Sequence, residues 1–512
     1  MTASTNPVTS RVGLEVLQSG GNAVDAAVAM AATHVVVEPH TGHLGGDSFM
    51  MFHLARSGTT LALNASGAAP SGATREHFCN LGGIPEKGPL ASCVPGTVDG
   101  WAEASRQFGT MPLADLLGPA VEVARQGFPV QNRLARSLKR ASSTFRHYEG
   151  SARQYLNSNG DPPRIGEILR QPWLADTLET IGQQGADSFY RGALAQEIVD
   201  YWQGIGGLFT LDDFASHHSS IEKPLTVTYR GFDVMQQPLP SQGLLHLLML
   251  NIVETFPLKE WGLHSPDAVH CMLEAKKLAF QVKDHHLGDP ERIYVPVERL
   301  LDKDFAAELA EGIDMNRARN LTTEETTISS DTDFLCVVDK DRNIASNIHS
   351  LFPGCGVTVP GVGALFNSRM LSFSLQEGHP NAVEPGKRPL HTLNTWMLFH
   401  EGRPLVVGGV TAGDLQVQFN LQIITQLIDG GAQLHEALDA PRWGNLRDRE
   451  ITLEDRNAGG LFDELGRRGH QLTAQSAWGA TGRAHAIAID YNRGILIGHS
   501  ESRDDGGFVM GY

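Results

Sequence analysis

The sequence predicts a layered α/β protein in which β-sheets are sandwiched between layers of helices. Three observations indicate this class. Segments of helical spacing come first, strands occur through both halves, and neither a fixed-period repeat nor a long glycine- and proline-rich hinge divides the 512 residues. We therefore expect one domain over residues 1–512.

The expected helices of the first half each combine an apolar stripe with a glycine stop. The first runs from Val12 to Ser19 and ends at Gly20. Asn22 then caps a helix so rich in alanine and valine that no polar face remains, so this helix should be buried on all sides. Further helices are expected at 98–108, 113–125, 173–183, 194–203, 243–256 and 265–286.

The expected strands are short apolar or alternating runs bounded by turn residues. Residues 48–54 and 60–66 should pair around the turn at 56–58, and LTVTYRGFDVMQQ is a further strand segment. Beyond residue 332 the chain becomes richer in strands, which are expected in GVTVPGVGALFNS, TWMLFHEGRPLVVGG, EITLE, RAHAIAID and GILIGHS, with helices at 418–430 and 461–468.

The most informative stretch runs from Asn320 to Phe352. Its first part, LTTEETTISSD, is polar and has no apolar period, which is typical of an exposed loop. From Phe334 the chain turns apolar, passes the turn DKDRN and resumes with alternation over 344–351, which predicts a buried hairpin. Thr332 therefore lies at the boundary between loop and strand.

A threonine at this boundary suits an enzyme that cuts its own chain. Cleavage before Thr332 would leave it as a free amino terminus on a rigid strand. Its own α-amine, which titrates near about 8, could then take the hydroxyl proton. On spacing alone, a solvated loop that runs into a strand explains the same pattern, so both interpretations stay open at this point.

The composition argues against several classes of partner. The chain carries 41 basic and 58 acidic residues, a net charge of −17, which disfavours nucleic acids and anionic membranes. Five cysteines without CxxC spacing favour a reducing compartment. The start MTASTNPVTSRVG has no apolar core of signal-peptide length and no window reaches the length of a membrane span, so we expect a cytoplasmic location.

No cofactor and no metal ion are expected. The adjacent His285 and His286 point in different directions on a helix, and no carboxylate or thiol recurs at ligand spacing. The glycine-rich turn in TGHLGGDSFM lacks the spacing of a phosphate-binding loop, which argues against a nucleotide.

Several segments resemble the γ-glutamyltranspeptidase family of N-terminal-nucleophile hydrolases. They are GGNAVDAAVA, TGHLGGDSFM, DTDFLCVVDKDRNIAS and the C-terminal SRDDGGFVMGY, in the family's order and over nearly the whole chain. The resemblance implies a four-layer αββα sandwich made as one precursor. It also implies cleavage between Asp331 and Thr332 into a large subunit, 1–331, and a small subunit, 332–512, that stay together; a homodimer of the pair is left open.

The same resemblance implies amide hydrolysis through an acyl-enzyme ester. Thr332 matches the family's nucleophile, and Ser350 matches a second hydroxyl residue that supports it. Ala412 and Gly413, in VVGGVTAGDLQ, stand in place of the glycine pair whose backbone N–H groups stabilise the oxyanion. The alternatives are a structural role for Ser350, and for Asp414 either bracing this loop or capping the helix that follows.

The substrate-binding positions depart from the family. Ser66, in NASGAAP, stands where an arginine would clamp the α-carboxylate of a γ-glutamyl substrate. In LFNSRMLSF, Arg369 replaces a glutamine and Ser372 an aspartate that would bind the α-amino group. No acid then remains to hold an ammonium, whereas the guanidinium fork of Arg369 suits a carboxylate. A surface position for Arg369 is the alternative interpretation.

These changes favour a small amide that carries a carboxylate. Phe352 replaces an asparagine and should narrow the pocket, and His391 and Thr392 replace a pair of serines. The pattern resembles the family's cytoplasmic short forms, which include oxamate amidohydrolase, so we expect hydrolysis of oxamate to oxalate and ammonia. The alternatives are a γ-glutamyl hydrolase or transpeptidase acting on glutathione-like substrates, a cephalosporin (glutaryl) acylase and, from another class, an unprocessed scaffold protein.

Overall fold

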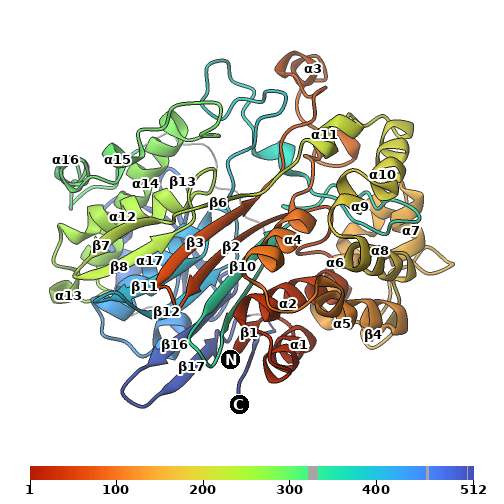
Figure 1. Ribbon diagram of the computed structural model, residues 1–512. Coiled ribbons are helices and arrows are strands. Elements are labelled where there is room, and N and C mark those ends of the chain that lie inside the picture. Colours follow the sequence, from red (N-terminus) through yellow and green to blue (C-terminus); the bar gives the residue numbers. More distant parts are fainter. Residues whose placement is uncertain (321–331, 457–459, 504) are drawn as a thin grey trace. The chain divides into compact units, whose positions relative to one another are not determined.

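The structure is a computed structural model and describes residues 1–320, 332–456, 460–503 and 505–512. The chain divides into two compact units. Unit 1 comprises Met1–Glu222, Asp331–Pro389 and Phe508–Tyr512, and unit 2 comprises Lys223–Ser330 and Leu390–Gly507. Each unit combines helices with mainly antiparallel sheets (Figure 1), so the mixed α/β class predicted from the sequence is confirmed.

Unit 1 is built on a seven-stranded antiparallel sheet. Its strands, in spatial order, are β18 (Phe508–Met510), β1 (Thr2–Ser4), β9 (Thr332–Val338), β10 (Ile344–Ser350), β2 (Asp47–Leu54), β3 (Thr59–Ala65) and β6 (Ser220–Glu222). The two hairpins predicted from the sequence, β2–β3 and β9–β10, are joined by the pairing of β10 with β2. Residues near 47 and near 332 therefore lie on strands that are separated by a single strand.

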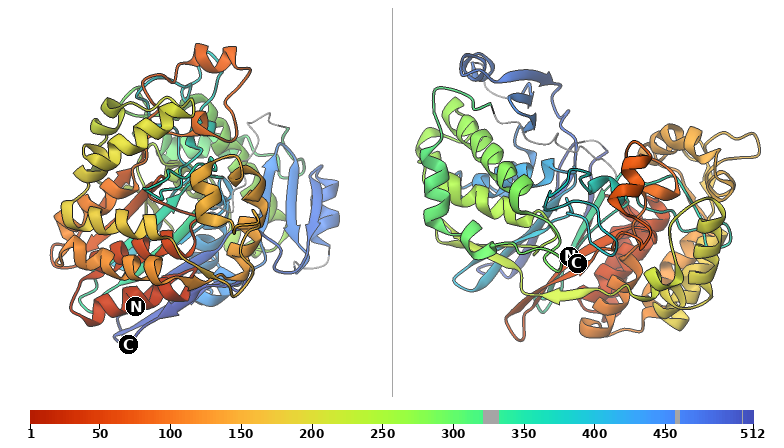
Figure 2. Two further views of the ribbon diagram at one scale, coloured as in Figure 1. Left: turned by 90° about the vertical axis from the view of Figure 1, so that its right-hand side faces the viewer. Right: turned by 90° about the horizontal axis from the view of Figure 1, so that it is seen from above.

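Helices cover one face of this sheet. α2 (Ala23–Val37) packs on β9 and β10, and α4 (Thr97–Phe108) packs on β2 and β3 and contacts α2. All of α2 is buried, as its lack of a polar face predicted, and Asn22 caps it together with Asp25. α1 (Pro7–Gln18) and α5 (Leu113–Gln126) pack against α2, and α8 (Pro172–Gln184) packs against α5. These helices therefore lie on the same side of the sheet as α2 (Figure 2). The other elements of unit 1 are α3 (Arg75–Asn80), α6 (Asn132–Phe145), α7 (Glu149–Tyr155), α9 (Asp187–Tyr190), α10 (Ala193–Gly204), α11 (Leu211–Ala215), β4 (Phe128–Pro129), β5 (Ile168–Leu169) and 3-10 turns at Pro89–Ala91 and Arg369–Ser372.

Unit 2 has a six-stranded antiparallel sheet of its own. The spatial order is β17 (Ile495–Ser500), β16 (Ala484–Asp490), β12 (Arg403–Val410), β11 (Trp396–His400), β8 (Phe232–Gln236) and β7 (Leu225–Tyr229). α12 (Gly243–Glu254) packs on β7 and β8, α17 (Leu415–Ile428) packs on β12, and α14 (Pro266–His286) packs on α12. The strands β13 (Trp443–Arg447), β14 (Glu450–Glu454) and β15 (Gln471–Gln475) form a separate small sheet, drawn in blue in Figure 2. The remaining helices are α13 (Leu258–Trp261), α15 (Val297–Leu300), α16 (Lys303–Glu311), α18 (Leu434–Asp439) and α19 (Leu461–Arg467).

Three local predictions are corrected. GVTVPGVGALFNS is not a regular strand but an irregular segment with isolated bridges at Thr358 and Phe366, because Gly361 and Gly363 turn the backbone to positive φ. LTVTYRGFDVMQQ is a hairpin, β7–β8, rather than one strand. The helix expected from Gln418 begins earlier, with α17. No helix in the described ranges is both long and apolar enough to cross a membrane.

Candidate active site

Thr332 is the first residue of β9, and its hydroxyl lies against that of Ser350 on β10. The two residues are direct partners in the strand register, and Thr332 Oγ1 and Ser350 Oγ are 3.0 Å apart. Both side chains are buried. The backbone N–H of Phe352 donates to Ser350 Oγ at 2.8 Å. Ser350 therefore accepts a hydrogen bond from the backbone and can donate its own proton to Thr332.

Asp47 continues this row on the next strand, β2, as the direct partner of Ser350. Side chains of directly opposed residues point to the same face of a sheet, so Thr332, Ser350 and Asp47 share one face. Asp47 Oδ1 accepts the backbone N–H of Gly67 at 2.9 Å, and Oδ2 accepts Nε of Arg369 at 3.3 Å. Burial raises the pKa of Asp47 to about 6, and the nearby Arg369 limits the rise.

Arg369 is fully buried beside this row, which excludes the surface position left open above. Its guanidinium carbon lies 4.7 Å from the centre of the Phe352 ring. Burial lowers the pKa of Arg369, while Asp47 opposes that change. Neither Nη1 nor Nη2 of Arg369 has a hydrogen-bond partner among the described residues. Two donors of a buried cation thus remain unsatisfied, in the fork arrangement that binds a carboxylate.

Two other predicted residues of unit 1 border this arrangement. Phe352, which follows β10, has a left-handed backbone with φ of 60°, a conformation that is uncommon for a bulky side chain. Ser66 is buried, and its Oγ donates to Asn64 Oδ1 at 2.6 Å. Its carbonyl oxygen accepts Nε of Arg388 at 3.2 Å. Phe352 is therefore in contact with Arg369, whereas Ser66 forms hydrogen bonds with Asn64 and Arg388.

In unit 2, Ala412 and Gly413 form the turn between β12 and α17. Ala412 has φ of 154° and Gly413 has φ of 61°, so the turn uses two positive φ angles in succession. Such a conformation is strained for alanine and unstrained for glycine. Asp414 occupies the N-cap position of α17 but makes no side-chain capping hydrogen bond. It lies 3.7 Å from Nζ of Lys283 instead, which favours the bracing role over the capping role.

His391 and Thr392 lie in the same unit and are joined to this turn through Gln242. The side-chain amide of Gln242 donates to the carbonyl oxygen of Thr392 at 2.9 Å and to that of Gly413 at 3.2 Å. The backbone N–H of Gln242 donates to the carbonyl oxygen of His391 at 2.8 Å. One buried glutamine therefore holds both segments that the sequence analysis selected in this unit.

The structure thus assembles the predicted residues into two groups, each within one unit. Thr332, Ser350, Arg369 and Phe352 come together in unit 1, and the segments 391–392 and 412–414 come together in unit 2. The predicted cleavage residue Asp331 lies outside the described residues.

Sequence reasoning missed two residues. The expectation that no acid remains to hold an ammonium did not consider Asp47, which pairs with Arg369. Because Asp47 directly precedes the expected strand 48–54, the sequence could have placed it at the start of a strand. The strand that pairs with this one could not be predicted from the sequence. Gln242 gave no signal, because its role depends on two carbonyl groups that lie more than a hundred residues away in the chain.

Comparisons with known proteins agree with the sequence signature. A family model described as gamma-glutamyltranspeptidase matches residues 9–511. A glutathione hydrolase-like proenzyme of Bacillus subtilis (strain 168) is 36% identical over 99% of this chain and 98% of its own length. The oxamate amidohydrolase proenzyme of Klebsiella pneumoniae is 34% identical over 99% of this chain and 97% of its own. The crystal structure of a cephalosporin acylase from Bacillus halodurans superimposes with a TM-score of 0.93 at 34% identity, covering 100% of this chain and 96% of that one.

Proposed function

Since the chain belongs to the γ-glutamyltranspeptidase family and is a hydrolase whose relatives are made as proenzymes, we propose that it is an autoprocessed threonine amidohydrolase for small amides bearing a carboxylate. Oxamate, cleaved to oxalate and ammonia, is the substrate that we favour. The observation that carries this choice is the pair of unsatisfied Nη groups of Arg369, close to the row that begins at Thr332.

A carboxylate explains these donors better than an ammonium does. Leaving a buried guanidinium partly unpaired costs free energy, and a bidentate carboxylate would satisfy both Nη groups at once. Asp47 binds Arg369 through Nε, which leaves the outer edge of the fork open. The ring of Phe352 covers the guanidinium and restricts the space next to it, which favours a short substrate.

In the proposed reaction, cleavage before Thr332 yields the subunits 1–331 and 332–512. The new α-amine of Thr332 then takes the hydroxyl proton, and the oxygen attacks the amide carbon. Ser350 donates a hydrogen bond to the attacking oxygen, as its 3.0 Å contact supports. The backbone N–H groups of Ala412 and Gly413 stabilise the oxyanion, a role that rests on the family resemblance. Ammonia leaves, and water releases the acid from the ester.

The finer architecture is part of the same proposal. We propose for the whole chain the four-layer αββα sandwich that the family resemblance implies, and the likeness of the chain to the cephalosporin acylase supports this. The predicted cytoplasmic location and homodimer stay predictions.

The γ-glutamyl alternative has one observation in its favour. Asp47 supplies an acid close to Arg369, and an aspartate could meet the α-ammonium of a γ-glutamyl group. Its two oxygens are already bound by Gly67 and Arg369, which is why we place this function second.

Steady-state kinetics of the purified enzyme on oxamate and on a γ-glutamyl anilide test the choice. We expect faster turnover of oxamate, and Arg369→Met should lower kcat/KM for oxamate about ten- to a hundredfold, mainly through KM, because a charge-assisted contact contributes about 1.5–3 kcal/mol. Lysine at this position should recover only part of the loss, since it keeps the charge without the fork.

A matched control is Arg125→Met, which removes an exposed arginine that pairs with Asp176 and Glu179. It should leave both reactions unchanged. Two results would favour the γ-glutamyl function over oxamate hydrolysis. One is faster turnover of the γ-glutamyl compound by the parent, and the other is an Arg369→Met enzyme with the same kcat/KM for oxamate as the parent.

A further inference from the structure

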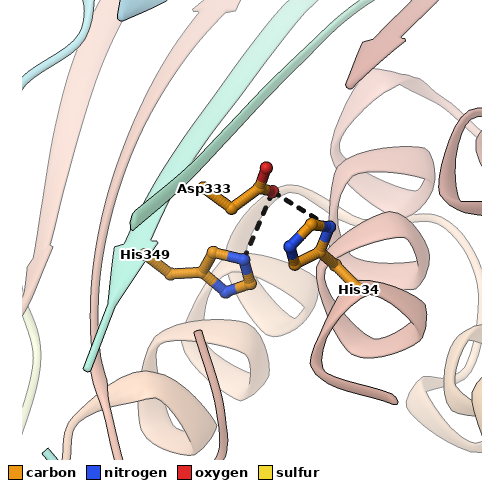
Figure 3. A group of neighbouring side chains, drawn as sticks. All are labelled: His34, Asp333 and His349. Atoms are coloured by element: carbon orange, nitrogen blue, oxygen red, sulfur yellow. Dashed lines mark ion pairs between the residues drawn. The ribbon is translucent and has the colours of Figure 1, made fainter. Parts of the chain in front are cut away.

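We propose that His34, Asp333 and His349 form a binding site for one divalent transition-metal ion, with Zn²⁺ as its occupant. Asp333 on β9 and His349 on β10 are direct partners in the register, and His34 comes from α2, which packs on both strands. All three side chains are completely buried. Figure 3 shows the two imidazole rings turned toward the same carboxylate oxygen of Asp333.

The spacing of the three ligand atoms suits a shared ion. Asp333 Oδ2 lies 3.2 Å from Nδ1 of His34 and 3.4 Å from Nε2 of His349, and the three atoms lie within 4.8 Å of one another. Zinc binds histidine nitrogen and carboxylate oxygen at about 2.0–2.2 Å, so two ligands at a tetrahedral angle are about 3.3 Å apart. Direct hydrogen bonds between charged partners are shorter, about 2.7–2.9 Å.

These atoms also lack other partners. Nδ1 of His34, Oδ2 of Asp333 and Nε2 of His349 have only one another as partners among the described residues, at distances longer than a good charged hydrogen bond. Buried polar atoms are nearly always paired, so several unpaired atoms directed at one point indicate a missing ligand. Two imidazoles and one carboxylate are a donor set that suits zinc.

The hydroxyl of Thr41 can hold His34 in the tautomer that binds a metal. The Thr41 hydroxyl lies 3.0 Å from the carbonyl oxygen of Glu38, to which it can donate its only proton, and in that arrangement it accepts the proton of His34 Nε2 at 2.8 Å. In the neutral ring, the lone pair of Nδ1 then faces the carboxylate of Asp333, a repulsive pairing unless a cation lies between them. Thr5 donates to the other carboxylate oxygen, Asp333 Oδ1, at 2.8 Å.

The packing leaves little freedom to the third ligand. A Cβ atom at Gly42 would lie 2.8 Å from the His349 ring, so the backbone of Gly42 supports that ring closely. The nearest further acid, Glu38, is 3.8 Å from His34 Nε2 and pairs with Arg133 at 2.9 Å. A water molecule is therefore the expected fourth ligand.

The ion would act on structure and not on the substrate. Consecutive residues of a strand point to opposite faces, so the side chain of Asp333 lies on the helix-covered face while that of Thr332 lies on the other. An ion bound there links α2 to β9 and β10 directly behind the proposed nucleophile. The sequence predicts no metal ion, whereas the tertiary structure brings these three ligands together. The site does not depend on which amide is the substrate.

A second buried cluster, His270, Glu274 and His470 in unit 2, serves as the control. His270 Nδ1 and His470 Nε2 are hydrogen-bonded at 2.9 Å, and Glu274 pairs with Lys277 at 2.7 Å. The nitrogens of His270 and the carboxylate of Glu274 are thus engaged, and only Nδ1 of His470 lacks a partner among the described residues, so we expect no ion there.

The test is elemental analysis by mass spectrometry of protein made without a polyhistidine tag in zinc-supplemented medium and dialysed extensively. We expect about one zinc ion per chain in the parent and in His270→Gln, and less than about one tenth of that in His34→Gln and His349→Gln. Thermal unfolding provides a second readout: a chelator should lower the Tm of the parent, and added Zn²⁺ should restore it.

A parent that holds no zinc, or the same zinc content in His34→Gln and His349→Gln as in the parent, would overturn the proposal. If both variants fail to fold by circular dichroism, the parent alone decides. A chelator-treated parent whose Tm does not respond to Zn²⁺ would then refute the site, and an imidazolium of His34 paired with Asp333 would take its place.

Discussion

Replacing Ser350 with alanine separates a role in the reaction from a role in structure. The change removes the hydroxyl that lies 3.0 Å from Thr332 Oγ1 and also the acceptor of the Phe352 backbone N–H. Loss of a hydrogen bond used in the transition state costs about 1–3 kcal/mol, so kcat should fall about 5- to 150-fold with little change in KM. The orphaned N–H of Phe352 should lower the free energy of unfolding by about 1–3 kcal/mol.

Ser48→Ala is the matched control for this experiment. Ser48 is a buried serine on β2 whose Oγ donates to Asn347 Oδ1 at 2.6 Å. It is the neighbour of Asp47 in the strand and therefore points to the opposite face of the sheet from Thr332. Its replacement should reduce stability without reducing kcat.

The assay is steady-state kinetics on oxamate together with urea unfolding, after a denaturing gel has established that chain cleavage is complete. A Ser350→Ala enzyme with normal cleavage and the kcat of the parent would show that Ser350 has only a structural role. Equal losses of kcat in Ser350→Ala and Ser48→Ala would refute the reasoning as well, because they would reflect a general distortion of the sheet.

Three further predictions concern processing, pH and backbone strain. Thr332→Ala should remain one chain of 55.5 kDa on a denaturing gel, while the small fragment of the parent should begin at Thr332 by N-terminal sequencing; any other first residue contradicts the assignment. Burial raises the pKa of Asp47 from 3.8 to about 6, so the folded state favours the protonated form and the contribution of Asp47 to stability falls as pH rises from about 4 to 6. The free energy of unfolding in urea should decrease over this pH range in the parent and decrease less in Asp47→Asn. The same pH dependence in both proteins would contradict this prediction. Ala412→Gly should raise the free energy of unfolding by about 1 kcal/mol with activity retained, because glycine tolerates the φ of 154°, whereas Ala412→Val should lower it; a less stable glycine variant would show that the turn is unstrained.

Local patterns in the sequence were sufficient for the regular elements. The run 334–338 and the alternation over 344–351 predicted the hairpin β9–β10, and the alanine- and valine-rich segment after Asn22 predicted a helix buried on all sides. These signals depend on neighbours within a few residues, which is why they can be read from one chain. GVTVPGVGALFNS was misread, because its β-branched residues suggested a strand while its glycines bend the backbone.

The sequence by itself determined the boundary at Thr332, the motifs that identify the family, and the departures at Ser66, Arg369 and Phe352. Only the tertiary structure decided that Arg369 is buried against Asp47 and that His34 faces Asp333 and His349. The physical reason is the pairing of β10 with β2, which sets Asp47 opposite Ser350 although the two are about three hundred residues apart. A register of this kind is fixed by the packing of the whole sheet and its helices, and no short stretch of the chain encodes it.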